Sequence, residues 1–431
     1  MRFAPRPEND FAQFIDTYYE ECRARFDRID GLAGKWMFRD LIPGMSDFDT
    51  RFIVRDGQTA DDWCRMSTAV GEAHLSLCTR YPAWARNLEH LPGVNVTWAE
   101  LTGARTYYPE YRQWSYYRTE EPGRMREALA ALDRRPWIVE DEYFHLKRFC
   151  TFYGRYDRGI DPCINLGGQA NKYPLHSRLM HYFAPPVQAA LSLLDRRPVV
   201  GKFEALETAA QRFPQLACWA PVFEILHADY ETPRWYEEPH LTRLEDVLEA
   251  GLRALAEALA DVLRLVPSGS GPDVGAWKRA LAHAPVDPAM KLFDNAKFSR
   301  LMKGRLLFYA RAPAHFDTEF LIRNELGRID GNFFVVPFRT FWRVRTGETV
   351  DDAPAVLDRL RGELLTGDEV RCAREFHELA SREWPAGAER KAALAIAQVF
   401  DGFYHALHKV SEAALASSPP AAAARRGGSA Q

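Results

Sequence analysis

The first part of the chain alternates between two apolar periodicities, and this alternation restricts its fold more than any other feature. Apolar residues at helical spacing occur twice, and the second run follows Thr59, a residue suited to an N-cap. Short apolar runs typical of strands lie between and after the two helical runs. We predict a helix, two strands, a helix and a third strand, over residues 8–30, 35–42, 47–54, 59–81 and 92–101. This order is typical of a small mixed α/β domain.

The rest of the chain is dominated by helical patterns. Residues 202–214 form a helical run that ends at a proline, and residues 241–266 and 387–416 form two long periodic helices. The stretch 107–185 is rich in Tyr, Arg and Trp and gives no clear assignment. The predicted organisation is an α/β domain, a helical domain, an additional mixed and helical region, and a disordered tail, at residues 1–125, 126–266, 276–415 and 416–431.

Composition and charge narrow the classes of function. The chain has 431 residues and a net charge of −3, from 56 basic and 59 acidic residues, so no general positive field attracts nucleic acid or an anionic membrane. No run of about 18 apolar residues predicts a membrane span, and the N-terminus lacks the apolar stretch of a signal peptide. Seven cysteines without a CxxC pair favour reduced thiols over a disulfide framework. These features predict a cytoplasmic protein.

Residues 41–54, LIPGMSDFDTRFIV, place Asp47 and Asp49 one residue apart at the head of a predicted strand. Side chains alternate along a strand, so the two carboxylates share one face and repel each other. A cation between them removes the repulsion, and Mg²⁺ is the usual one, since it binds carboxylate oxygens and leaves room for phosphates. The alternative is a solvated turn, because Ser-Asp after Pro-Gly is ordinary turn chemistry. A looser copy, HFDTEFLIR at 315–323, lacks the first aspartate; we interpret it as a coincidence, although a decayed duplication would look the same.

Gly34 precedes Asp47 by thirteen positions. With this glycine, the Asp-x-Asp run resembles the polymerase-beta-like nucleotidyltransferase superfamily, and most closely its aminoglycoside adenylyltransferase branch. The family signature is a Gly-Ser pair followed by Asp-x-Asp on a strand, and here Lys35 stands in place of the serine. The resemblance implies that Asp47 and Asp49 bind the Mg²⁺ ions that accompany a nucleoside triphosphate. It also implies that Gly34, Lys35 and Ser46 contact the phosphates.

A second segment, GKFEALETAAQRFP at 201–214, resembles the start of the helical domain in the same branch. In that branch a lysine opens a helix of the form Lys-x-x-Ala-x-x-x-Ala, which a proline ends. The matching residue is Lys202, whose role in the family is to reach the triphosphate. A lysine at a helix start suits this role, because the N-terminal amides also favour anions. The alternative is an ordinary solvated helix N-terminus.

The third predicted strand departs from the family pattern. The family carries a carboxylate there that acts as general base, whereas the matching residue here is Asn95, and an amide cannot accept that proton. Glu100, five residues further on, is the residue that we name as the catalytic candidate. Further candidates flank the aromatic segment 106–125, and they are Glu120, Glu121, Asp141 and Glu142. The aromatic segment is the predicted acceptor pocket, and its alternative role is core packing.

The predicted fold class is α+β: a small nucleotidyltransferase-like mixed-sheet domain, then a largely helical domain and an extra C-terminal mixed or helical region. The predicted reaction is Mg²⁺-dependent transfer of a nucleotidyl group, most simply AMP from ATP, to a hydroxyl or amine of a small molecule. Lys35, Arg39 and Lys202 would stabilise the developing charge. Mg²⁺ and ATP are the expected cofactors, and the small-molecule acceptor and the nucleoside triphosphate are the expected partners. Neither a membrane nor a nucleic acid is expected as a partner.

Two other interpretations stay open at this point. The fold could be retained without catalysis, in a protein of nucleotide sensing or assembly, and Asn95 favours this interpretation. Alternatively the Asp-x-Asp run is incidental to an unrelated enzyme. The loop 165–178, NLGGQANKYPLHSR, is a second candidate for binding phosphates, through Lys172 and Arg178, or else an ordinary surface loop.

Overall fold

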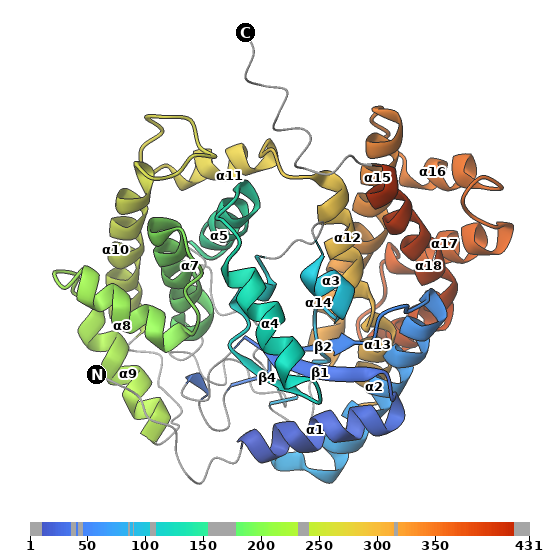
Figure 1. Ribbon diagram of the computed structural model, residues 1–431, viewed down its shortest axis with the longest axis horizontal. Helices are drawn as coiled ribbons and strands as arrows, with labels where there is room; N and C mark the ends of the chain where they lie inside the picture. Colours follow the sequence, from blue (N-terminus) through green and yellow to red (C-terminus); the bar gives the residue numbers. More distant parts are fainter. Residues whose placement is uncertain are drawn as a thin grey trace.

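The computed structural model describes residues 11–35, 40–41, 46–84, 87–88, 90–103, 109–153, 178–231, 241–313 and 318–417. This part of the chain is mixed α/β, with one four-stranded sheet and a largely helical remainder. Figure 1 shows the sheet between two groups of helices, α5 and α7–α11 on one side and α12–α18 on the other. None of the described helices is long and apolar enough to cross a membrane.

The sheet has the strand order β3-β2-β1-β4. Strand β1 is antiparallel to both of its neighbours, whereas β3 runs parallel to β2, so the sheet is mixed. Antiparallel pairing places the end of β1 beside the start of β2. The bounds of the four strands, in chain order, are Ile29–Gly34, Thr50–Val54, Val96–Thr97 and Tyr116–Thr119.

The strands differ from the prediction in their positions. The first strand is Ile29–Gly34 rather than 35–42, so the two glycines of IDGLAG lie in a buried strand. The second begins at Thr50, which leaves both aspartates just before it. The third covers only Val96–Thr97, because the Thr97 side chain caps a short helix, α3 (Trp98–Thr102), that starts directly afterwards.

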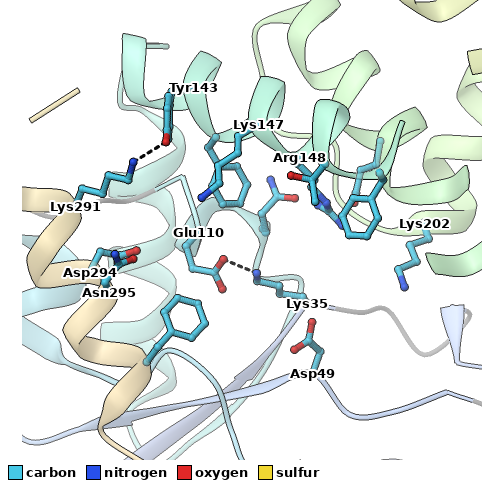
Figure 2. A pocket seen from close by; sticks show the side chains of 16 residues that line it. Lys35, Asp49, Glu110, Tyr143, Lys147, Arg148, Lys202, Lys291, Asp294 and Asn295 are labelled. Carbon is cyan, nitrogen blue, oxygen red and sulfur yellow. Dashed lines mark hydrogen bonds and ion pairs between the residues drawn. The ribbon is translucent and has the colours of Figure 1, made fainter. Parts of the chain in front are cut away.

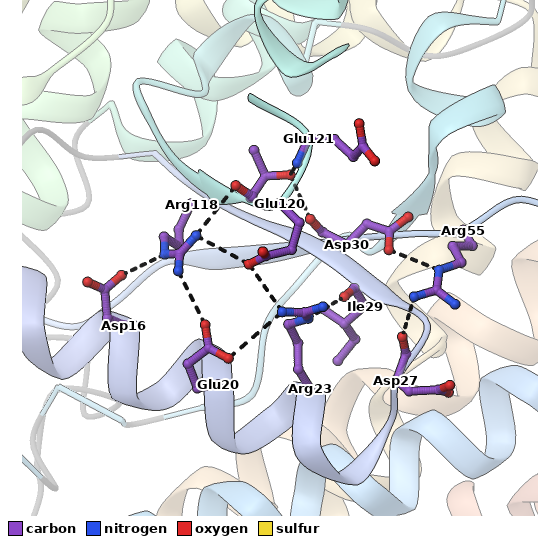
Figure 3. A network of polar contacts seen from close by, with 11 residues as sticks. Asp16, Glu20, Arg23, Asp27, Ile29, Asp30, Arg55, Arg118, Glu120 and Glu121 are labelled. Carbon is purple, nitrogen blue, oxygen red and sulfur yellow. Dashed lines mark hydrogen bonds and ion pairs between the residues drawn. The ribbon is translucent and has the colours of Figure 1, made fainter. Parts of the chain in front are cut away.

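Two helices cover one face of the sheet. They are α1 (Phe11–Arg25) and α2 (Ala60–Arg80), and Thr59 caps α2 as predicted, with its hydroxyl accepting a hydrogen bond from Asp62 N at 3.1 Å. Salt bridges tie α1 to the β4 edge: Arg118 pairs with Asp16 at 3.0 Å, and Arg23 pairs with Glu120 at 3.1 Å (Figure 3). These exposed pairs fix the direction of α1 more than they add stability.

The middle of the chain forms a helical group with its own apolar core. That core runs from Leu146 to Trp277 and includes Phe183 and Phe203, all fully or almost fully buried. The helices of this group are α5 (Val139–Phe152), α7 (Ala184–Asp195), α8 (Lys202–Arg212), α9 (Trp219–Glu231), α10 (Leu241–Ala260) and α11 (Val274–Ala282). Helix α4 (Pro122–Asp133) belongs to a small separate core that it shares with the sheet, through Met125, Ala128 and Leu132. A π-helical turn, Arg178–Phe183, precedes α7.

The C-terminal helices share one core with the N-terminal ones. Buried residues of α1 and α2, such as Tyr18 and Met66, belong to the same apolar cluster as Leu306 on α13 and Phe403 on α18. Over this described region no extended strand occurs, so the predicted mixed character is in fact helical. The helices are α12 (Pro288–Ser299), α13 (Met302–Arg311), α14 (Thr318–Asp330), α15 (Val336–Thr346), α16 (Ala353–Leu360), α17 (Gly367–Ala380) and α18 (Glu389–Ser417), with a π-helical turn at Gly331–Val335.

Helices α2 and α13 approach each other closely at a pair of glycines. A Cβ atom on Gly71 would lie 2.8 Å from Gly304 Cα, and one on Gly304 would lie 2.0 Å from Ser67 O. The Ser67 hydroxyl also accepts a hydrogen bond from Gly304 N at 2.9 Å. Only residues without a side chain permit this approach, which holds the C-terminal helices against the sheet domain.

Candidate functional site

A cavity of about 350 Å³ lies at the end of the sheet where β1 ends and β2 begins (Figure 2). Its walls come from distant parts of the chain: the residues next to β1 and β2, helix α5, the start of α8, and helix α12. Five cations and three carboxylates line it, namely Lys35, Asp49, Glu110, Lys147, Arg148, Lys202, Lys291 and Asp294. The excess of positive charge favours an anionic ligand.

A cluster of ion pairs forms the side of the cavity nearest the sheet. The Lys35 ammonium bonds to the Glu110 carboxylate. Arg51 bridges two carboxylates, with Nε 3.1 Å from Glu110 Oε1 and Nη1 2.9 Å from Asp49 Oδ1. Burial raises the pKa values of Asp49 and Glu110, but the cations Arg51 and Lys35 outweigh it and hold both pKa values below their ordinary range. Both carboxylates are therefore ionised at neutral pH.

The sheet explains why these groups meet. Gly34 pairs with Thr50 across the two strands, so the next residue outward, Lys35, donates its backbone N–H to Asp49 O at 3.3 Å. Gly93 leaves room for the guanidinium of Arg51, since a Cβ there would lie 3.0 Å from Arg51 Cζ. Strand register, rather than local sequence, brings the lysine and the aspartate together.

Three cations that line the cavity have no partner among the described residues. Lys147 and Arg148 lie on α5 and Lys202 begins α8, and none of them forms a hydrogen bond or an ion pair within the described residues. Asp40 fixes the start of α8, because its Oδ1 accepts a hydrogen bond from Phe203 N at 3.1 Å. Burial lowers the pKa values of both Arg148 and Lys202. Partly buried cations that lack counter-charges are suited to phosphate oxygens.

The other residues of the predicted phosphate and metal site lie close to this cavity without lining it. Asp47 Oδ2 is 3.5 Å from His90 Nε2; burial lowers the pKa of His90, but Asp47 outweighs this and raises it. The carbonyl of Ser46 accepts a hydrogen bond from Asn87 Nδ2 at 2.6 Å. Gly34 is the last residue of β1. The structure therefore brings together Lys35, Asp49 and Lys202, with Asp47 beside them.

Glu100 is placed elsewhere, and the prediction of a catalytic role for it is corrected here. Its two carboxylate oxygens each accept a hydrogen bond of 2.6 Å from Arg300, and it does not line the cavity. Burial raises the pKa of Glu100, but Arg300 outweighs it and lowers the pKa to about 2. Such a carboxylate is a poor proton acceptor near neutral pH. Its role is to cap α3 and to neutralise Arg300.

Asn95 has a structural role at the predicted position of the third carboxylate. It is fully buried, its Oδ1 accepts a hydrogen bond from Phe52 N at 2.8 Å, and its Nδ2 donates to Gly93 O at 2.6 Å. These bonds join β2 to the segment before β3. An aspartate here would lose the amide donor and leave an unpaired buried charge.

The remaining candidate bases also lie outside the lining of the cavity. Glu120 belongs to the surface network of Figure 3. Asp141 accepts a hydrogen bond from Arg112 at 3.1 Å, and Glu142 caps the backbone N–H of Leu265 at 2.8 Å. Glu121 precedes α4. Arg39 and the loop 165–178, apart from the backbone of Arg178, fall outside the described residues.

Sequence reasoning missed three of the charged residues that matter here. Arg148 lies in an amphipathic run that includes LKRF and is typical of a helix, but nothing in that run indicates that its side chain faces the cavity. Asp294 lies in a region for which the family resemblance offers no counterpart. Glu110 falls in the aromatic segment that was predicted as the acceptor pocket. That segment supplies Glu110 and Gln113 to the cavity, while its Tyr111 is buried in the core.

Asp47 and Asp49 are better suited to an Mg²⁺ ion that binds together with phosphates than to a metal ion that the protein holds alone. No group of three or more His, Cys, Asp or Glu side chains that could hold a metal occurs within the described ranges. Asp47 and Asp49 stand next to His90 and Arg51, which already balance part of their charge. Mg²⁺ commonly needs only one or two protein carboxylates when phosphates and water complete its coordination. The two aspartates meet that requirement.

No family model, no curated protein and no solved structure matches the chain. The function must therefore be argued from the cavity itself. Its excess of cations over carboxylates and its position between the sheet and two groups of helices suit it to a small anionic ligand.

Proposed function

We propose that the cavity binds a nucleoside triphosphate with Mg²⁺ and transfers its nucleotidyl group, most simply AMP from ATP, to a small-molecule acceptor. One observation carries this proposal: Lys35, Asp49 and Lys202, taken from three separate segments, line the same cavity. Lys35 belongs to the Gly-Lys pair and Asp49 to the Asp-x-Asp run, while Lys202 is the first residue of α8. A solvated turn and a solvated helix start would have no reason to converge.

The unpaired cations support a triphosphate as the ligand. Lys147, Arg148 and Lys202 offer positive charge that no described residue neutralises. Each charge-assisted hydrogen bond to phosphate is stronger than a neutral one, and the cavity limits competition by water. The charge balance, five cations against three carboxylates, leaves the cavity short of negative charge until an anion binds.

In the proposed reaction, the acceptor oxygen attacks the α-phosphorus and forms the new P–O bond. The bond between the α-phosphorus and the bridging oxygen breaks, and pyrophosphate leaves with the electron pair. Lys35, Arg148 and Lys202 stabilise the negative charge on the phosphates as it shifts toward the leaving group. Asp47 and Asp49 would hold Mg²⁺, which supplies further neutralisation of that charge when bound.

A second candidate function is nucleotide binding without transfer. It is favoured by Asn95, whose side chain is used to join β2 to the neighbouring segment, and by the ion pair between Asp49 and Arg51. Under this interpretation the protein binds the same ligand and senses it. The two candidates therefore share the binding site and differ only in the release of pyrophosphate.

The test is calorimetric titration of ATP and GTP, with and without Mg²⁺, followed by measurement of pyrophosphate release. We expect Mg²⁺-dependent binding by the wild type and loss of the Mg²⁺ dependence in the double variant Asp47→Asn/Asp49→Asn. Lys202→Ala should weaken binding about tenfold, equivalent to about 1.4 kcal/mol.

The matched control is Lys391→Ala, which removes an exposed lysine on α18 that does not line the cavity. It should bind as the wild type does. Absence of binding, or binding that the aspartate and Lys202 variants leave unchanged, would refute the proposed site. Binding without pyrophosphate release for any hydroxyl or amine acceptor would favour the sensing function.

A further inference from the structure

Two buried polar side chains that line the cavity each have one atom without a hydrogen-bond partner among the described residues. Asp294 is 7% exposed and Gln113 is 3% exposed, and both line the cavity. Within the described residues, Asp294 Oδ1 accepts no hydrogen bond and Gln113 Nε2 donates none. Burying an unsatisfied polar atom is unfavourable, which favours a polar ligand in this cavity.

The α12 side of the cavity lies across from Arg148 and Lys202, two of the three cations without a partner among the described residues. In Figure 2, Asp294, Asn295 and Lys291 project from α12, while Arg148 and Lys202 lie across the cavity, with Glu110 and Lys35 between the two groups. A triphosphate on the cations would therefore leave the α12 side open. We call this side, which the α12 residues Lys291, Asp294, Asn295 and Phe298 line, the α12 subsite.

We propose that the α12 subsite binds the acceptor of the transfer reaction, that the acceptor presents a hydroxyl group there, and that Asp294 takes the proton from it. This inference rests on the proposed nucleotidyl transfer and deepens it by naming the base and the acceptor chemistry. It also gives the C-terminal region a role in the reaction, since α12 carries the proposed base.

A hydroxyl group suits the Asp294 carboxylate, because it can donate a hydrogen bond to the carboxylate and then give up its proton to it. A charged ammonium group donates only, and it would stand among Lys147, Lys291 and the buried Lys297. The charges of the cavity therefore select neutral or anionic hydroxyl compounds over polycations.

The surroundings of Asp294 suit it to proton transfer near neutral pH. Burial raises its pKa to about 7, against the opposing effect of Lys297, whose Nζ is 3.9 Å from Oδ1. A base with a pKa near the working pH gives the most efficient proton transfer. Five charged or titratable groups act on Asp294. Lys297 lies on α12 and Arg300 directly after it, while Tyr111 begins η3 (Tyr111–Gln113) and Glu110 directly precedes it. The fifth is Lys35, which follows β1.

Water is the simplest hydroxyl compound and serves as the probe when no other acceptor is added. Its oxygen forms a bond to the α-phosphorus, its proton passes to Asp294, and pyrophosphate leaves, so that ATP and water give AMP and pyrophosphate. The experiment measures AMP formation from Mg²⁺-ATP between pH 5.5 and 8.5, in parallel with the ATP dissociation constant. The variants are Asp294→Asn, Asp294→Glu and the control Asp261→Asn, an exposed aspartate after α10 that does not line the cavity.

We expect Asp294→Asn to bind ATP within about twofold of the wild type and to form AMP about 10²–10⁴ times more slowly. The wild-type rate should rise with pH and level off above about 7, and the asparagine variant should lose this rise. Asp294→Glu should restore part of the rate, and Asp261→Asn should behave as the wild type.

The outcomes separate this inference from the function on which it rests. If the wild type forms AMP and Asp294→Asn forms it equally fast with the same pH profile, the assignment of Asp294 is wrong and the transfer function stands. If the wild type binds no Mg²⁺-ATP, the proposed function fails first. If the wild type binds Mg²⁺-ATP but forms AMP at no pH, both the transfer reaction and its base are refuted.

Discussion

Arg51 holds the carboxylate of Glu110 inside the protein at 3.1 Å, with only 5% and 6% of the two side chains exposed. The same guanidinium reaches Asp49 at 2.9 Å, so one side chain on β2 positions both carboxylates nearest the sheet. Lys35 completes the cluster from the end of β1. The site is therefore assembled by the sheet itself, before any ligand binds.

Replacement of Arg51 by methionine should destabilise the protein by about 3–5 kcal/mol, because it leaves Glu110 buried with one cation instead of two. The measurement is urea unfolding at pH 7. Arg55→Met is the matched control, since Arg55 follows the same strand and pairs with Asp30 at 3.1 Å but is 51% exposed. It should cost about 0–1 kcal/mol. Equal losses in the two variants would contradict the importance of the buried cluster.

The Glu100–Arg300 pair should make stability depend on pH in a defined range. The pKa of Glu100 is lowered from 4.5 to about 2 in the folded protein, so the unfolded chain binds a proton first as the pH falls. The contribution of this residue to stability is therefore complete above pH 4.5 or so and is lost as the pH falls toward 2.

Glu100→Gln should consequently be less stable than the wild type by about 3–5 kcal/mol at pH 7, and the difference should shrink on going to low pH. Unfolding free energies of both proteins between pH 2 and 7 provide the measurement. A difference that stays constant across that range would show that the pair does not titrate as described.

The glycine at the crossing of α2 and α13 should not tolerate a methyl group. Gly304→Ala places a Cβ 2.0 Å from Ser67 O, which forces the two helices apart and should cost about 1–3 kcal/mol or more. Gly327→Ala is the control, since a Cβ there meets nothing within 4 Å and lies in the helix α14. That change should be neutral or stabilising by up to about 1 kcal/mol. Thermal unfolding of the two variants distinguishes the outcomes.

Arg148 should show a trade-off between stability and binding. Its guanidinium has no partner within the described residues and burial lowers its pKa, so the free protein gains nothing from the charge. Arg148→Met should therefore unfold at the same or a higher temperature and bind inorganic triphosphate about tenfold more weakly, a change of about 1.4 kcal/mol. A variant that loses stability but keeps its affinity would mean that Arg148 is a structural residue.

Local signals in the sequence predicted two helices closely, whereas the helix predicted over residues 8–30 ends at Arg25, before β1. The second helix was placed correctly at both ends, because its start depends on Thr59 and Asp62, which are three residues apart. Helix α8 also begins where it was predicted, at Lys202, and it ends at Arg212, two residues before Pro214. Capping and periodicity are properties of neighbouring residues, so a single sequence contains them.

The strands were predicted less well because they depend on distant partners. All six residues of β1 are buried, so IDGLAG shows no alternation and its glycines resembled the end of a helix. The two related runs show the limit most directly: TRFIV from Thr50 is a strand, whereas TEFLI from Thr318 begins the helix α14. Tertiary context decides between them.

The sequence predicted only some residues of the site, because the others depend on contacts between distant segments of the chain. Lys35, Asp49 and Lys202 were named from local motifs, and they do line one cavity. Glu110 and Asp294 could not be named, because their importance comes from packing between segments that are far apart in the chain.

The core that α2 shares with α13 and α18 has a consequence for the order of folding during synthesis. The sheet domain is made before α12, α13 and α18, so the apolar surface of α2 that these helices cover stays uncovered by them until they have been made. The α12 wall of the cavity is attached to that same core, through residues such as Leu292. The chain therefore completes its cavity only after α12 and the helices that support it have been made, and a protein shortened before α12 would keep the Asp-x-Asp run without the α12 wall.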